Sequence, residues 1–205
     1  SQREASTFRL SKAQGGYQTC DKASDYLEQL QVGFHALRPL RVCLGTSLAR
    51  IAEFAETLFE PLPCSLELVS LPRRRRDLHS DSDLDHARVG ERVRQTSSHL
   101  GIVIDDDGRS CALIDERGEW IPAAGWIALL EDHFQNVRHE EVHPWTGSHT
   151  TLPQEMARQQ MTLGISPEGR IWCGSTTPRC DGLVTLSLIL EALSRSDEDL
   201  SARII

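Results

Sequence analysis

The stretch LGIVIDDDGRSCALIDERG, residues 100–118, decides how this sequence folds. Its first apolar run, Leu100–Ile104, predicts a short buried strand that ends at a glycine-containing acidic turn. A second apolar run, Cys111–Ile114, predicts the partner strand of a β-hairpin. The carboxylates expected together at the mouth of this hairpin are those of Asp105, Asp106 and Asp107.

Three neighbouring carboxylates repel one another unless something offsets their charge. A hard cation, an arginine or open water can do this, and Mg²⁺ suits oxygen ligands of this kind. Because Asp and Gly are also ordinary turn residues, a solvated acidic turn is the alternative interpretation. Spacing alone therefore leaves two hypotheses for this loop, a metal or phosphate-handling site and a turn without chemical function.

The composition is that of an ordinary globular protein. The chain has 205 residues, of which 39% are hydrophobic and 25% charged, and this length suffices for one large domain or two small ones. Its formal net charge of -8 argues against a nucleic-acid partner. No apolar run reaches the roughly 20 residues of a membrane helix, and no signal peptide is visible, so we expect a cytoplasmic protein without a membrane partner. Because the chain begins with Ser, we also expect further sequence beyond it.

Apolar periodicity predicts alternating helices and strands before and after the hairpin. The expected elements are helix 24–37, strand 40–44, helix 48–59, strand 65–71, helix 87–97, helix 126–134, helix 154–161, two strand segments within 163–174 and a helix that Asp181 begins. This order indicates an α/β fold of two consecutive sandwich domains, each a mixed sheet packed with helices. We expect an N-terminal arm over residues 1–24, a first domain over 25–125 and a second over 126–205.

Four consecutive arginines, Arg73–Arg76, precede several aspartates. One interpretation is a solvated loop in which these charges pair with one another. The other is an anion or phosphate site, because guanidinium groups bind phosphate in a bidentate manner.

The hairpin and its surroundings resemble the phosphohexomutase family, the phosphoglucomutases and phosphomannomutases. Residues 101–118 are similar to the family's second-domain segment, in which a metal loop of the type D-G-D-G-D-R follows a strand and a D-E-x-G turn comes later. Residues 26–27 and 40–46 resemble the entry to that domain. Residues 181–190 resemble the D-G helix that closes the third domain. The resemblance covers about residues 25–200 and implies the two central domains of a four-domain enzyme, without the first-domain phosphoserine loop or the phosphate-binding fourth domain.

The sequence also departs from the family motifs. Asp105 and Asp107 occupy the first two metal-ligand positions, Asp106 stands where the family has Gly, and Arg109 and Ser110 replace the third Asp and the Arg. In the sugar-reading loop G-E-x-S-G-H, the residues that stand where the family has Glu, Ser and His are Ser166, Glu168 and Arg170. The segment Thr146–His149 is similar to a phosphoserine loop but follows the metal loop, so we assign it no such role.

The resemblance implies a first function. The full protein would move a phosphoryl group on a hexose phosphate through a phosphoserine, with Mg²⁺ at Asp105, Asp107 and the added acid Asp106. This chain alone would supply no catalytic residue and would not be active without the flanking domains of the same protein. Which residues bind substrate is open.

Two other functions fit the same residues. A non-catalytic homologue that keeps the scaffold for binding or assembly agrees with the altered motifs. A haloacid-dehalogenase-type phosphatase would use the Asp-x-Asp pair Asp105 and Asp107, but that class needs a downstream Lys, and no Lys follows residue 107.

Overall fold

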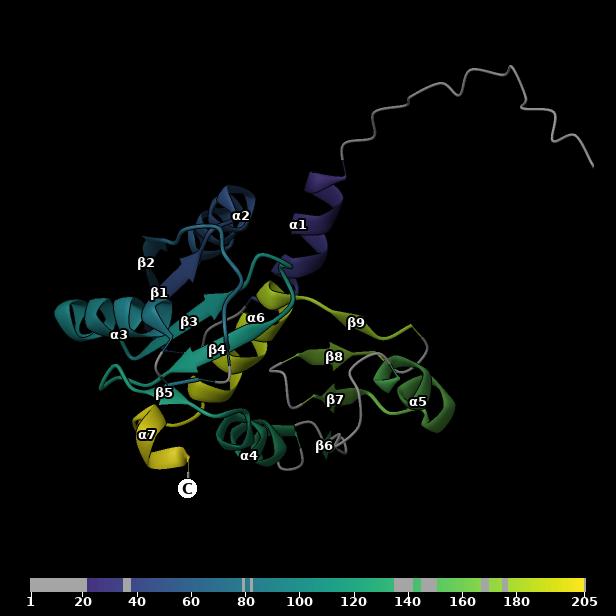
Figure 1. The fold of residues 1–205 in the computed structure, drawn as a ribbon. Helices are drawn as coiled ribbons and strands as arrows, with labels where there is room; N and C mark the ends of the chain where they lie inside the picture. Colours follow the sequence, from purple (N-terminus) through teal and green to yellow (C-terminus); the bar gives the residue numbers. More distant parts are fainter. Residues whose placement is uncertain are drawn as a thin grey trace, which may run out of the picture.

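A computed structural model describes residues 22–34, 38–78, 80–81, 83–134, 142–144, 151–166, 170–174 and 177–204, to which all structural statements below refer. Two sheets form its framework (Figure 1). The larger sheet has the strand order β2 (Ser65–Ser70), β1 (Arg41–Thr46), β3 (Leu100–Ile104), β4 (Cys111–Ile114), β5 (Trp120–Ile121). Strand β1 is parallel to both β2 and β3, whereas β4 and β5 are added antiparallel.

Helices cover both faces of the larger sheet. Helix α3 (Leu84–Thr96) lies on one face, where Val89 and Val93 join a buried cluster with Val103 of β3. The helices α1 (Ala23–Gln31) and α2 (Ala49–Phe59) belong to the opposite layer. All five residues of β3 are buried, as expected for a central strand that is covered on both sides.

The smaller sheet has the order β6 (Val142–Pro144), β7 (Leu163–Ile165), β8 (Ile171–Cys173), β9 (Arg179–Cys180). Strands β6 and β7 are parallel, and the remaining pairs are antiparallel. Helix α5 (Leu152–Gln159) packs on β7 through Leu152 and Met156. Helix α4 (Ala123–His133) connects the two halves of the chain and contacts β6.

Helix α6 (Gly182–Leu193) lies between the two sheets in Figure 1. Every residue of this helix except Val184 is buried, and its leucines share one core with residues of both sheets. A helix with apolar residues on all sides is stable when it is buried between other elements, because it has no polar face to expose to water. The short helix α7 (Leu200–Arg203) follows and returns to the larger sheet, where Ser201 donates to Glu116.

The two mixed sheets with their helices confirm the predicted α/β fold class. Several element bounds differ: α1 ends at Gln31 rather than at residue 37, just before Gly33, and α3 begins three residues early, because the Asp83 side chain accepts from the Asp85 N–H. Helix α4 begins at Ala123, three residues before the predicted start at residue 126. The domain boundary near residue 125 stays a prediction.

Some of the expectations fall on other parts of the chain. The N-terminal arm up to residue 21, the segment 146–149 and Glu168 lie outside the described residues. Among the helices of the described residues, none has the length and apolar character that crossing a bilayer requires.

Candidate functional site

The acidic loop follows β3 directly and is a tight turn. The Asp105 N–H donates to the Ser110 carbonyl oxygen at 3.0 Å, and the Gly108 N–H donates to the Asp105 carbonyl oxygen at 2.9 Å. Gly108 has a φ of 68°, a left-handed conformation that glycine adopts without strain. The structure therefore places Asp105, Asp106 and Asp107 together at the hairpin mouth, as the sequence predicts.

A buried arginine lies against two of these carboxylates. The side chain of Arg76 is 0% exposed, and its Nη1 atom lies 2.8 Å from Asp105 Oδ1 and 2.5 Å from Asp106 Oδ1. Its Nε atom lies 2.8 Å from Asp85 Oδ2, and its Nη2 donates to the Pro72 carbonyl oxygen. One guanidinium thus joins three carboxylates and a backbone carbonyl.

Arg76 and its carboxylate partners stabilise one another in their charged forms. Burial lowers the pKa of Arg76, but the hydrogen bonds that it donates to its carboxylate partners outweigh burial and hold the pKa above its ordinary value. A hydrogen bond from Ser47, followed by that from Arg76, lowers the pKa of Asp106. Arg74 lies 2.5 Å from Asp83 and 3.0 Å from Asp85. Arg74 and Arg76 are therefore paired internally, and Arg76 is buried rather than solvated.

Asp107 is held separately from its two neighbours. Its Oδ1 accepts the N–H groups of Arg109 and Ser110, both at 2.8 Å. Its Oδ2 accepts the Ser110 hydroxyl at 2.9 Å and Arg170 Nη2 at 2.7 Å. Burial raises the pKa of Asp107, but these four hydrogen bonds together lower it below its ordinary value.

Arg170, which donates to Asp107, belongs to the second half of the chain. It immediately precedes β8, and its Nε also donates to Ser110 Oγ at 2.8 Å. This residue stands where the family motif has His, and its contacts join the loop before β8 to the acidic loop. Ser166, where the motif has Glu, is fully buried, and its hydroxyl has no hydrogen-bond partner among the described residues.

This donor set does not fit a resident Mg²⁺. The Oδ1 atoms of Asp105 and Asp106 face a guanidinium, and both oxygens of Asp107 accept hydrogen bonds from the turn and from Arg170. Within the described ranges, no group of three or more His, Cys, Asp or Glu side chains could hold a metal ion. A cationic side chain at the position of a metal opposes metal binding. The metal assignment to Asp105, Asp106 and Asp107 stays a prediction.

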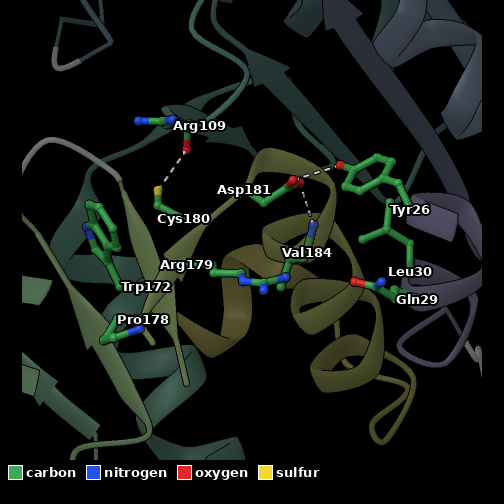
Figure 2. Close-up of a pocket in the computed structure, with 10 residues that line it drawn as sticks. All are labelled: Tyr26, Gln29, Leu30, Arg109, Trp172, Pro178, Arg179, Cys180, Asp181 and Val184. Carbon is green, nitrogen blue, oxygen red and sulfur yellow. Dashed lines mark hydrogen bonds between the residues drawn. The ribbon is translucent and has the colours of Figure 1, made fainter. Parts of the chain in front are cut away.

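A cavity of about 500 Å³ lies beside the acidic loop (Figure 2). It is lined by α1, by the loop residue Arg109, by β8 and β9, and by the start of α6. Asp181 caps α6 by accepting the Leu183 N–H at 2.8 Å, and it also accepts the Tyr26 hydroxyl at 2.7 Å. The Gly182 N–H donates to the Gly108 carbonyl oxygen at 2.9 Å, which fixes this helix start against the acidic loop.

Sequence reasoning did not find the partners of the acidic loop. The arginine run contained Arg76, but its contact with Asp105 depends on how two loops fold at one sheet edge. Arg170 was visible as a departure from the sugar-loop motif, although not as a contact of Asp107. Nothing in the sequence indicated the cavity, because its lining comes from four separate segments.

The fold of two mixed sheets with their helices is similar to that of solved structures of phosphohexomutases. The chain superposes with a TM-score of 0.80 on a phosphoglucomutase/phosphomannomutase family protein from Burkholderia thailandensis, at 18% identity, over 95% of this chain and 48% of that one. A protein described as a phosphomannomutase, from Thermus thermophilus, gives 0.68 at 12% identity, over 92% and 51%.

An N-acetylglucosamine-phosphate mutase, a member of the alpha-D-phosphohexomutase superfamily, gives a TM-score of 0.54 at 10% identity, over 88% of this chain and 57% of that one. Neither a protein-family model nor a curated protein sequence matches the chain. The similarity therefore establishes the fold, and the chain spans about half the length of the first two of these structures.

Proposed function

We propose that this chain is the central two-domain part of a phosphohexomutase-fold protein that binds a ligand without catalysing metal-assisted phosphoryl transfer. The observation that carries the proposal is the pairing of the buried Arg76 with Asp105 and Asp106. In this arrangement one oxygen of each carboxylate contacts a protein cation, and a cation at that place opposes the binding of Mg²⁺.

The second contact of the loop supports the same function. Arg170 stands where the family motif has a polar sugar-reading residue, and it binds Asp107 and Ser110 instead. Its guanidinium is therefore occupied within the protein. Asp106 and Arg170, which both depart from the family motifs, thus form ion pairs within the protein.

The second candidate is the mutase activity itself, in which the full protein would transfer a phosphoryl group on a hexose phosphate with Mg²⁺. The shared fold over 95% of the chain favours this candidate. It would require the flanking domains of the same protein as partners, since the chain covers about half of the first two solved structures reported above. In either case we propose a cytoplasmic protein without nucleic-acid or membrane partners.

A Mg²⁺ titration of the chain separates the two candidates. A ligand that binds only the folded state raises the midpoint of thermal unfolding. Because we expect the acidic loop not to bind Mg²⁺, this midpoint should stay constant up to millimolar Mg²⁺. A saturable increase would count for the mutase. Incubating the full-length protein with a hexose phosphate, its bisphosphate and Mg²⁺ then tests activity directly, and turnover would overturn the non-catalytic proposal.

A further inference from the structure

Strand β2 leaves one edge of the larger sheet open. It is the last strand in the order of this sheet and lies at the outer side of the sheet in Figure 1. The N–H groups of Ser65 and, just past the strand, of Leu71 donate to carbonyl oxygens in and next to β1. Because the N–H and carbonyl groups of successive residues in a strand point to opposite sides, those of Leu66, Leu68 and Ser70 point away from β1. No strand of the described residues pairs with this edge.

The edge lacks the features that usually prevent pairing with another chain. Edge strands are commonly protected by proline, lysine, a bulge or a very short length. Strand β2 has six residues, contains neither proline nor lysine, and pairs with β1 in an unbroken register. Its charged side chain, Glu67, forms an ion pair with Arg92 of α3. The main-chain groups of this edge can therefore accept a further strand.

A hollow of about 360 Å³ lies beside this edge, on the side of α3. A Cβ atom on Gly45 of β1 would come within 2.5 Å of Val89, and Gly45 pairs with Val69 of β2. Arg88, the neighbour of Val89, is therefore level with Val69, and Arg88 and Val69 both line the hollow. Arg88 is exposed and forms no ion pair within the described ranges. The hollow thus presents a cation next to the open edge.

We propose that the open edge of β2 binds the same edge of a second copy of this chain. Two identical edges related by a twofold axis run antiparallel and form a closed dimer. When Leu68 lies opposite Leu68 of the second copy, Leu66 lies opposite Ser70, and every outward-facing residue of both edges takes part in hydrogen bonds. Centring the pair on Glu67 instead would place two glutamates opposite each other, which is unfavourable. The register centred on Leu68 is therefore favoured.

Charge complementarity supports a second copy as the occupant. In the register centred on Leu68, Glu67 of the second copy lies opposite Val69. Opposite side chains of an antiparallel pair point to the same face, so this glutamate reaches the hollow that Arg88 lines. Each Glu67 then lies between Arg92 of its own chain and Arg88 of the other. The inference does not depend on the proposed function, because it uses no residue of the acidic loop.

Sedimentation equilibrium over a range of micromolar concentrations tests the dimer. We expect a reversible equilibrium between monomer and dimer. Ser70→Pro removes an N–H that points away from β1, and the Ser70 side chain is exposed, so urea unfolding should show a folded variant. Its dimer dissociation constant should be at least tenfold higher than that of the wild type. Ser70→Ala, which keeps the N–H, is the matched control and should dimerise like the wild type.

Charge reversal tests the register. Arg88→Glu and Glu67→Lys should each dimerise at least tenfold more weakly than the wild type, which corresponds to about 1.4 kcal/mol. An equimolar mixture of these two variants should recover the dimer, because the side chain at position 88 of each variant then faces an opposite charge at position 67 of the other. Arg179→Glu, at an exposed arginine of β9 in the smaller sheet, changes the net charge as Arg88→Glu does and should dimerise like the wild type.

Three results would overturn this inference. A wild-type chain that stays monomeric at every concentration would leave the edge of β2 to a strand of another protein or of flanking sequence. A dimer with the same dissociation constant in the wild type and in Ser70→Pro would place the contact elsewhere. If the mixture of Arg88→Glu and Glu67→Lys dimerises no better than either variant alone, the pairing centred on Leu68 is wrong. None of these measurements involves Mg²⁺, so the dimer and the proposed function can fail separately.

Discussion

The guanidinium of Arg76 lies 2.8 Å from a carboxylate oxygen of Asp105, although 29 positions separate the two residues. Strands β2 and β3 are both parallel to β1, so the loops that follow them emerge at the same edge of the sheet. Arg76 comes from the loop after β2 and Asp105 from the loop after β3. One buried ion pair therefore joins the two loops at the edge where a ligand of an α/β sheet would be expected.

Replacing Arg76 with leucine should strongly destabilise the protein. Three carboxylates would lose their common partner, and breaking a buried ion pair from one side costs about 3–5 kcal/mol. Urea unfolding would measure this change in the free energy of unfolding. The control is Arg50→Ala, since Arg50 forms an exposed pair with Glu53 and should change stability by about 0.5 kcal/mol or less. A similarly small effect at Arg76 would contradict the importance of its pairing.

Removing the same guanidinium should make the acidic loop responsive to metal. In Arg76→Leu the neighbouring carboxylates no longer contact a cation of the protein, and Mg²⁺ prefers oxygen ligands of this kind. Millimolar Mg²⁺ should then raise the free energy of unfolding of the variant by about 1 kcal/mol, with no change in the wild type. The double variant Arg76→Leu, Asp105→Asn is the control and should lose the response. If both variants respond equally, the metal binds elsewhere.

The Asp107 carboxylate should contribute stability that depends on pH. Its pKa in the folded state is lower than the ordinary 3.8, so its contribution is complete above that value and is lost as the pH falls through the folded-state pKa. Asp107→Asn should therefore cost about 1–3 kcal/mol at pH 7 and less below pH 3.8, as measured by urea unfolding at several pH values. Asp25→Asn, at an exposed pair with Lys22, should be nearly neutral throughout. A pH-independent cost at Asp107 would argue against the charge as its origin.

His86 should make the protein less stable in mild acid. The side chain is 2% exposed, and burial is the first cause that lowers its pKa below the ordinary 6.5, although Asp83 and Asp85 oppose this effect. The unfolded chain therefore binds the proton more readily, so stability present above pH 6.5 is lost as the pH falls toward the folded-state pKa. Thermal unfolding at pH 5 and pH 7 should show a smaller difference in His86→Gln than in the wild type.

His99 is the internal comparison for this experiment, because burial, with Arg41 and Arg38, also lowers its pKa. The double variant His86→Gln, His99→Gln should show a still smaller dependence on pH than either single variant. An unchanged dependence in His86→Gln would assign the acid sensitivity to other groups.

Sequence reasoning reached the hairpin with accurate bounds, because Leu100–Ile104 and Cys111–Ile114 are uninterrupted apolar runs flanked by turn residues. It missed β6 at Val142–Pro144, which is short and carries no period that separates it from a loop. Strand β9 was missed for the same reason. Whether such a short segment forms a strand depends on the neighbouring strand with which it hydrogen-bonds. The local sequence carries no information about that neighbour.

The position of the three aspartates could be predicted, but their contacts could not. Three adjacent aspartates after a strand are visible in any sequence, so their position at the hairpin mouth could be predicted. Their partners could not be, because Arg76 and Arg170 reach them from loops 29 or more positions away. A run of four arginines also does not reveal which of its members becomes buried.

Helix α6 makes the two sheets depend on each other for burial. A Cβ atom on Gly182 would come within 2.8 Å of Ile104 in the larger sheet, while the leucines of the same helix share a core with Leu163 and Ile171 in the smaller one. Without residues 126–205 the larger sheet would lose the helix that covers it, and without residues 25–125 the same helix would expose its leucines to water. The two sheets and their common helix therefore form a single packing unit.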